Sequence, residues 1–516
     1  MTVVRTRRAD HPSRPRSTTT GGAGAPAARA SIFPRVSPAH LLWKDTRTYR
    51  RRYEKSASAL VATARALERN RPLGGREKEF LALYRATADA DARLFTDVWL
   101  DPTAYFWVRM AYQLTATCLS GSPLPPLAEA YCADVGAARP EDALATHLDG
   151  FKRFVLALRL AAKGRVRFSR PLDVTLPLAI PATGLSLVGD GVVRIHALRG
   201  RRLELEHDGR RASIELVPGR ADGIEVAACP ALAAGGVDVD LQPHALNLPG
   251  LGFAREVVKL PLEFQATHAG LVGEALTLVK RHHPRAHAHF ARMMRLLVLK
   301  PCKMAGYSNL SHSDLPGAAI VSLLGDPYEM ADTLIHELHH NRLFFIEEAG
   351  PFFRDSTAAV LTQRYYSPWR DDLRPLHGLF HALYVYLPVA WFWLAVHRSA
   401  EVDASRRPYV TDRVLRIPRQ LRIAAAVLRR HAELTERGAA LFAEMEREVG
   451  AIGDAVRALE LPADAPAIKL QLDGSLIAER GDPDERPLTV REAVTAHIAR
   501  HDLQGQCGEI APLLAS

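Results

Sequence analysis

The stretch GDPYEMADTLIHELHHNRLFF, residues 325–345, decides the fold around it because it predicts one well-marked helix. Asp326 can cap the first turn, Pro327 suits the first helical position, and Glu329 stands where a capping box places a carboxylate. Gly350, followed directly by a proline, predicts that the helix ends shortly before it. We therefore expect a single capped helix at the centre of this part of the chain.

Two histidines give this helix a chemical role. His336 and His340 are four residues apart, so both rings project from one face of a helix and can share a metal ion. Glu337 lies beside them and completes an H-E-x-x-H motif. The motif also arises by chance, and the alternative is a solvated helix with a polar stripe. The marked cap and the histidines of a later helix favour a metal site.

The third ligand decides which metal chemistry this site performs. A metzincin would have glycine and histidine where this chain has Leu343 and Ile346, so that class is excluded. A thermolysin-like zinc site needs a glutamate from a later helix. Glu347 and Glu348 lie on the same helix, roughly 10 Å along its axis from the second histidine, which predicts that they are too far away to bind the same ion. The next glutamate is Glu401.

A second helix is predicted from RPLHGLFHALYVYLP, residues 374–388, with Pro375 at its start and His377, His381 and Tyr384 on one face. We choose His381 as the third ligand and keep His377 as an outer-shell partner or the alternative ligand. Three neutral imidazoles leave positions for two oxygen donors and a small oxidant, which favours iron with a chelating co-substrate over a hydrolytic zinc ion. The alternative is that both are ordinary interior histidines.

Two arginines precede this helix in YYSPWRDDLRP, residues 365–375. A guanidinium group binds a carboxylate through two parallel hydrogen bonds, and a 2-oxo acid that chelates iron needs such a contact at its distal carboxylate. Arg370 or Arg374 could provide it. The alternative is that each arginine pairs with neighbouring Asp371 or Asp372 on a solvated loop.

The runs HELHHNRLFF, YYSPWR, RPLHGLFHALYVYL and SHSDLPGAAIVSL together resemble the HExxH-motif proteins found with ribosomally made, modified peptides, which are iron- and 2-oxoglutarate-dependent peptide β-hydroxylases. The resemblance covers roughly residues 305–400, where the four motifs occur in the family's order. It implies Fe(II), 2-oxoglutarate as co-substrate and O2, with hydroxylation at the β-carbon of a residue in a precursor peptide. The matching metal and co-substrate positions are His336, His340, His381, Arg370 and Arg374.

In a hydroxylase of this kind, Glu337 is freed from activating water and can orient the substrate or a ligand. The alternative function is a zinc metallopeptidase acting on a peptide, in which Glu337 is the general base. A strand predicted at residues 318–323 leads into the helix of the first motif. An exposed edge of such a strand can pair with an extended peptide, as in zincin-like arrangements.

The pattern of the whole chain predicts an α+β fold that is mainly helical, with a β-rich module between helical regions. We expect a disordered basic tail at 1–37, a helical region at 38–165, the β-rich module at 166–251, the metal-binding catalytic region at 252–402 and a helical C-terminal region at 403–516. One more capped helix is expected near the C-terminus.

Charge and cysteine usage narrow the partners of the protein. The net charge of +10 comes from residues 1–52, and the remaining 55 basic and 55 acidic residues balance, so the charge does not indicate a nucleic-acid partner. The five cysteines are odd in number and far apart, which fits a reducing cytoplasm, and no apolar segment follows the early arginines as in a secretory signal. We expect the apolar run at 376–396 to be a buried core helix, not a membrane span, and the four histidines within 281–295 to be core or surface residues.

Overall fold

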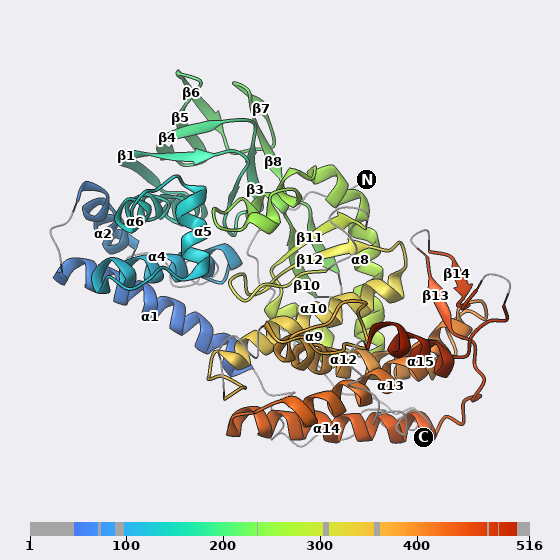
Figure 1. Cartoon of the computed structure of the whole chain (residues 1–516). Helices are drawn as coiled ribbons and strands as arrows, with labels where there is room; N and C mark the ends of the chain where they lie inside the picture. The colour runs from blue at the N-terminus through green and yellow to red at the C-terminus, as the bar shows by residue number, and fades with distance from the viewer. Residues whose placement is uncertain are drawn as a thin grey trace, which may run out of the picture.

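The computed structural model gives a mixed α+β protein, shown in Figure 1. The predicted basic tail and Cys507 lie outside the described part, and the other four cysteines form no disulfide with one another. The residues that the structure describes are 46–70, 74–87, 98–234, 236–302, 309–354, 362–471, 474–482 and 485–502.

Helices make up the described chain before residue 162, as the sequence predicts. Prolines in the first turn start α4, α5 and α6, and the side chain of Asp101 accepts a hydrogen bond from Thr103 N to cap α4. The helices are α1 (Thr46–Asn70), α2 (Gly75–Thr87), α4 (Pro102–Ser120), α5 (Pro126–Asp134), α6 (Pro140–Asp149) and α7 (Lys152–Ala161).

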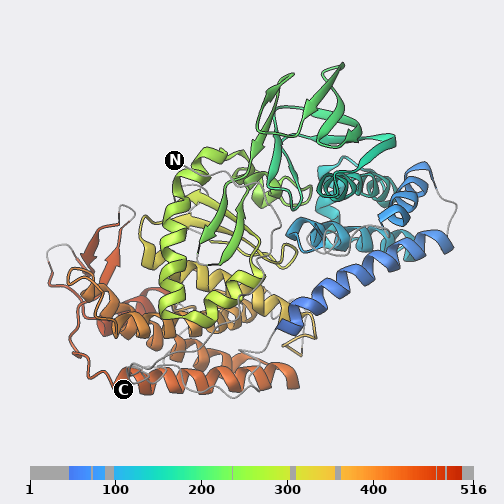
Figure 2. The same cartoon turned by 180° about the vertical axis from the view of Figure 1, so that it is seen from behind.

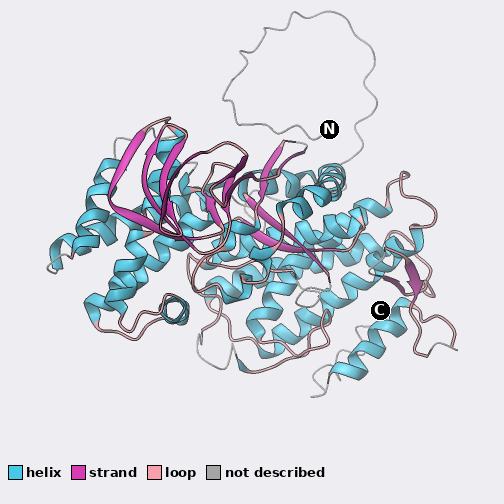
Figure 3. Cartoon of the chain, turned by 90° about the horizontal axis from the view of Figure 1, so that it is seen from above, coloured by secondary structure: helices cyan, strands magenta, loops and turns pink. Residues whose placement is uncertain are grey.

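Two small antiparallel sheets follow these helices, and Figure 3 shows that most strands gather on one side of the molecule. Gly200 and Gly209 have φ of 64° and 73° in the turns on either side of β5, a conformation that favours glycine. The first sheet, in the order β1-β4-β5-β6, contains β1 (Arg165–Thr175), β4 (Val192–Arg199), β5 (Arg202–His207) and β6 (Arg210–Glu215). The second, in the order β2-β3-β8-β7, contains β2 (Leu178–Ile180), β3 (Leu185–Val188), β8 (Ile224–Ala228) and β7 (Gly219–Ala221).

A third sheet, in the order β12-β11-β10-β9, lies at the centre of the molecule. Its strands are β9 (Ala231–Ala234), β10 (Val237–Leu241), β11 (Leu296–Pro301) and β12 (Ala318–Leu323). The predicted β-rich stretch thus contributes β9 and β10 to the same sheet as β12, the strand that leads into the helix carrying His336 and His340. Short 3-10 turns, then α8 (Leu262–His282) and α9 (Pro284–Met293), connect β10 to the parallel strand β11, and Figure 2 shows α8 running along the sheet.

This central sheet separates two hydrophobic cores. Side chains alternate between the two faces of a strand, so Leu296 and Val298 pack into the core with the N-terminal helices and small sheets. Leu297 and Leu299 on the same strand pack into the other core, with α8, α9 and the later helices. Both faces of β11 are therefore buried, as is typical of a parallel strand.

The C-terminal half is helical again and forms the lower part of Figure 1. Its elements are α10 (Pro327–Glu347), α12 (Leu376–His397), α13 (Arg407–His431), α14 (Glu436–Arg457), β13 (Ile468–Leu470), β14 (Leu476–Ala478) and α15 (Val490–His501). Within the described part of the chain, α12 alone is long and apolar enough to cross a membrane, but 89% of its apolar window is buried inside the protein. It is an interior helix, as the sequence predicts.

Candidate metal centre

The helix α10 begins as predicted but without the predicted capping box. Asp326 accepts hydrogen bonds from Tyr328 N at 2.9 Å and Glu329 N at 3.0 Å. Glu329 does not return to the cap, because its buried carboxyl group accepts a hydrogen bond from the Tyr409 hydroxyl at 2.5 Å. The capping-box prediction for Glu329 is therefore wrong, and the reason is a partner 80 positions further along the chain, which local spacing does not reveal.

A buried carboxylate attaches α10 to the helices that follow it. Asp332 accepts a hydrogen bond from Trp393 Nε1 at 2.7 Å and forms an ion pair with Arg413. Trp393 lies on α12 and Arg413 on α13, so one side chain of α10 contacts both neighbouring helices. Removing one partner of a buried ion pair costs about 3–5 kcal/mol, so this contact helps to set the spacing of the helices that carry the histidines.

His336 and His340 meet as the sequence predicts. Their Nε2 atoms lie 3.1 Å apart. Two cis ligands of a metal ion with bonds of 2.0–2.1 Å lie about 2.8–3.4 Å apart, so the pair has the separation that an ion requires. Burial lowers the pKa of His336 to about 4 and lowers that of His340 well below its usual value. Both rings are thus neutral at physiological pH, which is the form that binds metals.

His381 comes from α12 and reaches the same group of rings, but it contacts the other side of His340. Its Nδ1 lies 3.3 Å from Nδ1 of His340, whereas His340 faces His336 through Nε2. The three histidines therefore form a chain, and they are not a set whose ligand atoms all lie within 4.8 Å of one another. One ring must adopt another rotamer before a single ion can contact all three.

Glu347 lies at the His381 end of this chain of three histidines, a contact that the sequence does not predict. Its Oε1 accepts hydrogen bonds from His377 Nε2 at 2.7 Å and His381 Nε2 at 3.1 Å. Burial raises the pKa of Glu347, but the hydrogen bonds and the charge interactions with His377 and His381 together outweigh it and lower the pKa to about 2. The only sequence signal for a role of Glu347 is its position on the same helix as His340, two turns further on. That spacing predicts that Glu347 does not bind the same ion, but it does not reveal that His381 contacts both Glu347 and His340.

The contacts fit one set of tautomers. His381 donates its Nε2 proton to Glu347 and accepts the Nδ1 proton of His340, which leaves Nε2 of His340 with a free lone pair facing His336. Metal-binding histidines commonly donate the other ring nitrogen to a carboxylate or a similar acceptor. In this arrangement His381 and Glu347 orient His340 for the ion.

Glu337 is the one acid of the motif and is almost completely buried, at 2% exposure. Burial raises its pKa to about 7, and its Oε2 atom has no hydrogen-bond partner among the residues that the structure describes. Neighbouring side chains hold its main chain in place: the Ser311 hydroxyl donates to the carbonyl oxygen of residue 337 at 3.2 Å, and Asn341 Nδ2 donates to the same oxygen at 3.1 Å. The main chain that carries this buried carboxyl group is thus fixed, and the carboxyl group belongs to the residue directly after His336.

The segment before α12 reaches the histidines through aromatic rings. Trp369 stacks on Tyr386 with ring centroids 4.6 Å apart and an interplanar angle of 1°, and Tyr386 contacts the His336 ring edge to face at 4.9 Å. Arg370 and Arg374 lie on this segment but pair with the same neighbour. Arg370 Nε lies 2.7 Å and Arg374 Nε lies 3.3 Å from the carboxylate of Asp372. Both arginines thus pair with a neighbouring aspartate, which is the alternative to carboxylate binding that the sequence left open.

The outer edge of β12 is only partly available to a peptide. Leu310 and Ile320 exchange two main-chain hydrogen bonds of 2.9 Å, and Asn309 Oδ1 accepts from Ser322 N at 2.8 Å. The expected free edge is thus covered at these positions by the chain just before it. Sequence alone did not indicate this, because a two-residue bridge has no periodicity.

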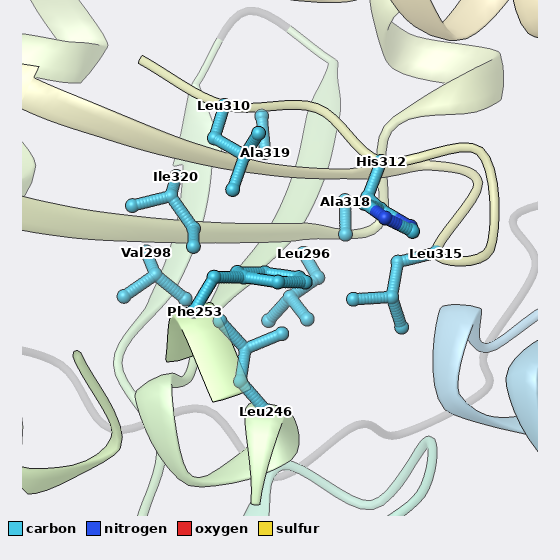
Figure 4. A pocket seen from close by; sticks show the side chains of 10 residues that line it. All are labelled: Leu246, Phe253, Leu296, Val298, Leu310, His312, Leu315, Ala318, Ala319 and Ile320. Atoms are coloured by element: carbon cyan, nitrogen blue, oxygen red, sulfur yellow. The ribbon is translucent and has the colours of Figure 1, made fainter. Parts of the chain in front are cut away.

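Two hollows lie away from His336, His340 and His381. Figure 4 shows a small apolar pocket at β11 and β12, where Phe253 stacks on His312 with ring centroids 5.2 Å apart. Four of its strand residues, Leu296, Val298, Ala318 and Ile320, belong to the core on the N-terminal side of the sheet. A second cavity of about 790 Å³ lies between the N-terminal helices and β1 and is lined by side chains of both charges, including Arg153 and Asp173. Neither lining contains a residue of the metal centre.

The four histidines before β11 remain outside the metal centre, as expected. His283 accepts a hydrogen bond from the main chain in the first turn of α9, and His289 accepts one from Arg342 Nη1 at 2.8 Å. Burial lowers the pKa of His289 to about 2, so the ring is a neutral acceptor for the guanidinium group. These histidines are structural residues of the core that packs beside α10.

The sequence matches no protein-family model and no curated protein. The likeness to the peptide hydroxylases stays a prediction that rests on the motifs within residues 305–400.

Proposed function

We propose that the protein is an iron(II)- and 2-oxoglutarate-dependent hydroxylase that acts on the β-carbon of a residue in a ribosomally made precursor peptide. The observation that carries the proposal is the meeting of α10 and α12, where His336 and His340 present nitrogens 3.1 Å apart and His381 lies against His340. The donor set is built from neutral imidazoles, which suit iron as well as zinc. The motif resemblance in residues 305–400 selects the hydroxylase from this choice.

Each residue has a distinct role in this proposal. His336 and His340 hold the ion, and His381 either joins them after a rotamer change or keeps His340 in its metal-binding tautomer. Bound iron(II) supplies the activation of oxygen. Because the imidazoles are neutral, they leave the positive charge of the ion available to attract an anionic co-substrate. Arg374 and Arg370 would exchange their contact with the Asp372 carboxylate for the distal carboxylate of 2-oxoglutarate.

One observation favours a second candidate, a zinc metallopeptidase. Glu337 combines burial, a pKa of about 7 and an oxygen without a partner, which suits a general base that accepts a proton from water at neutral pH. In the hydroxylase the same carboxyl group positions a ligand or the substrate. The two functions therefore differ in what they require of one side chain.

The test uses protein purified without oxygen, loaded with Fe(II), and given 2-oxoglutarate and a precursor peptide encoded beside its gene. We expect a mass gain of about 16 Da on the intact peptide, matched by succinate formation and dependent on oxygen. With zinc in place of iron the peptide should stay unchanged. Cleavage into two fragments with zinc, without oxygen or co-substrate, would overturn the proposal in favour of the peptidase.

Glu337→Gln provides a matched control, since glutamine keeps the size of the side chain but removes the base. The hydroxylase should retain substantial peptide-dependent succinate formation in this variant. A peptidase should lose cleavage by at least about 100-fold, within the range that general-base catalysis contributes.

A further inference from the structure

A second group of potential metal ligands lies outside the histidine chain of α10 and α12. His497 and His501 are four residues apart on α15, so their rings share one face, with centroids 4.6 Å apart. Nε2 of His497 lies 3.5 Å and Nε2 of His501 lies 3.4 Å from Oδ1 of Asp371. All three ligand atoms fall within 4.8 Å of one another.

These separations suit an ion better than direct hydrogen bonds. A hydrogen bond from a ring nitrogen to a carboxylate is normally about 2.7–2.9 Å long. Two ligands of a tetrahedral zinc ion with bonds of 2.0–2.2 Å lie about 3.3–3.6 Å apart. Both measured distances lie in the second range. Each histidine thus lies at the ligand separation from Asp371, and the two ring nitrogens lie within 4.8 Å of each other, so the group is of suitable size for a divalent ion.

A fourth residue holds one ligand in place. The Tyr366 hydroxyl lies 2.6 Å from Nδ1 of His497, and Tyr366 is itself 1% exposed. When Nδ1 donates its proton to this oxygen, Nε2 keeps a lone pair directed at Asp371. Ring nitrogens opposite a metal typically have such a partner. Burial also lowers the pKa of His497, which favours its neutral, metal-binding form.

We propose that His497, His501 and Asp371 form a second metal site, specific for a transition-metal dication such as Zn²⁺, with solvent in the remaining position. The ion would join α15 to the segment that carries Trp369 and precedes α12. Asp371 is 86% exposed, so the site is open to solvent and the ion can exchange. The proposal does not depend on the function proposed for the histidine chain.

The experiment measures Zn²⁺ stoichiometry by competition with a chromophoric chelator. The full chain carrying His336→Ala and His340→Ala should still bind one Zn²⁺. Adding His497→Gln and His501→Gln should reduce this to none. If the first variant binds no Zn²⁺, or if the added substitutions leave binding unchanged, the proposal fails.

Two further measurements keep the test independent of folding defects in the α10 variants. In the otherwise unaltered chain, His497→Gln with His501→Gln should lower the stoichiometry by one Zn²⁺, while Arg500→Gln on an exposed position of the same helix should leave it unchanged. In the same otherwise unaltered chain, Tyr366→Phe should weaken the site of His497, His501 and Asp371 about 10- to 100-fold, the effect expected from a lost outer partner. An unchanged stoichiometry in the double variant, or an equal loss in the Arg500 control, would overturn the assignment.

Discussion

Glu337→Gln should change how the stability of the metal-free protein depends on pH. The carboxyl group is 2% exposed, and its pKa in the folded protein is about 7 against an ordinary value of 4.5. Below pH 4.5 the group is neutral in both the folded and the unfolded chain, so it makes no difference. Between pH 4.5 and 7 the unfolded chain loses the proton while the folded chain keeps it, which lowers the free energy of unfolding. Above pH 7 both states are charged and the effect is constant.

The magnitude follows from the difference between the two pKa values. Each pKa unit of difference is worth about 1.4 kcal/mol, so wild type should lose about 3 kcal/mol relative to Glu337→Gln as the pH rises from 4.5 to 8. The comparison uses urea unfolding of both proteins after removal of metal by a chelator, followed by tryptophan fluorescence. The neighbouring histidines titrate in both proteins and cancel in the difference. Parallel curves for the two proteins across this window would refute the idea that Glu337 is held neutral by burial.

His340→Ala removes the ring that contacts both other histidines, so the ion held by His336 and His340 should be lost and the metal content should fall by one ion, while the circular dichroism is unchanged; an unchanged metal content would contradict the site. His381→Ala should lose more metal and activity than His377→Ala, because His381 contacts His340 directly; the reverse order would make His377 the ligand. Arg374→Ala should raise the 2-oxoglutarate concentration for half-maximal turnover about 30- to 150-fold, since a lost charged hydrogen bond costs about 2–3 kcal/mol. Arg370→Ala should have a smaller effect because Arg370 is more exposed, 48% against 34%; unchanged requirements in both variants would remove the arginines from the site.

Local signals in the sequence predicted the elements that carry the site. Asp326 and Pro327 mark the start of α10 correctly, and Pro375 marks the start of α12, because caps and proline act within one helical turn. The spacing of His336 and His340 likewise predicts their contact, since helix geometry alone places them on one face.

Contacts between segments that are distant in the sequence could not be predicted from these local signals. Glu329 binds Tyr409 from α13, and Glu347 binds two histidines of α12, although both lie on the helix that the sequence described best. Periodicity shows which face of a helix a residue occupies but not which side chain of another helix meets it. The contact of His381 with His340 and the hydrogen bond between Tyr366 and His497 also depend on how distant segments pack against each other, which periodicity does not show.

The division of the protein by its central sheet bears on how the chain can vary. Leu296 and Val298 have neighbours on the N-terminal side, whereas Leu297 and Leu299 have neighbours beside the histidine-bearing helices. Substitutions without shared neighbours have additive effects on stability, so compensating changes in one core need no response from the other. Apolar side chains of the core on the N-terminal side can then vary while the histidine half keeps its motifs. Such independence fits a chain in which the recognisable motifs are confined to residues 305–400.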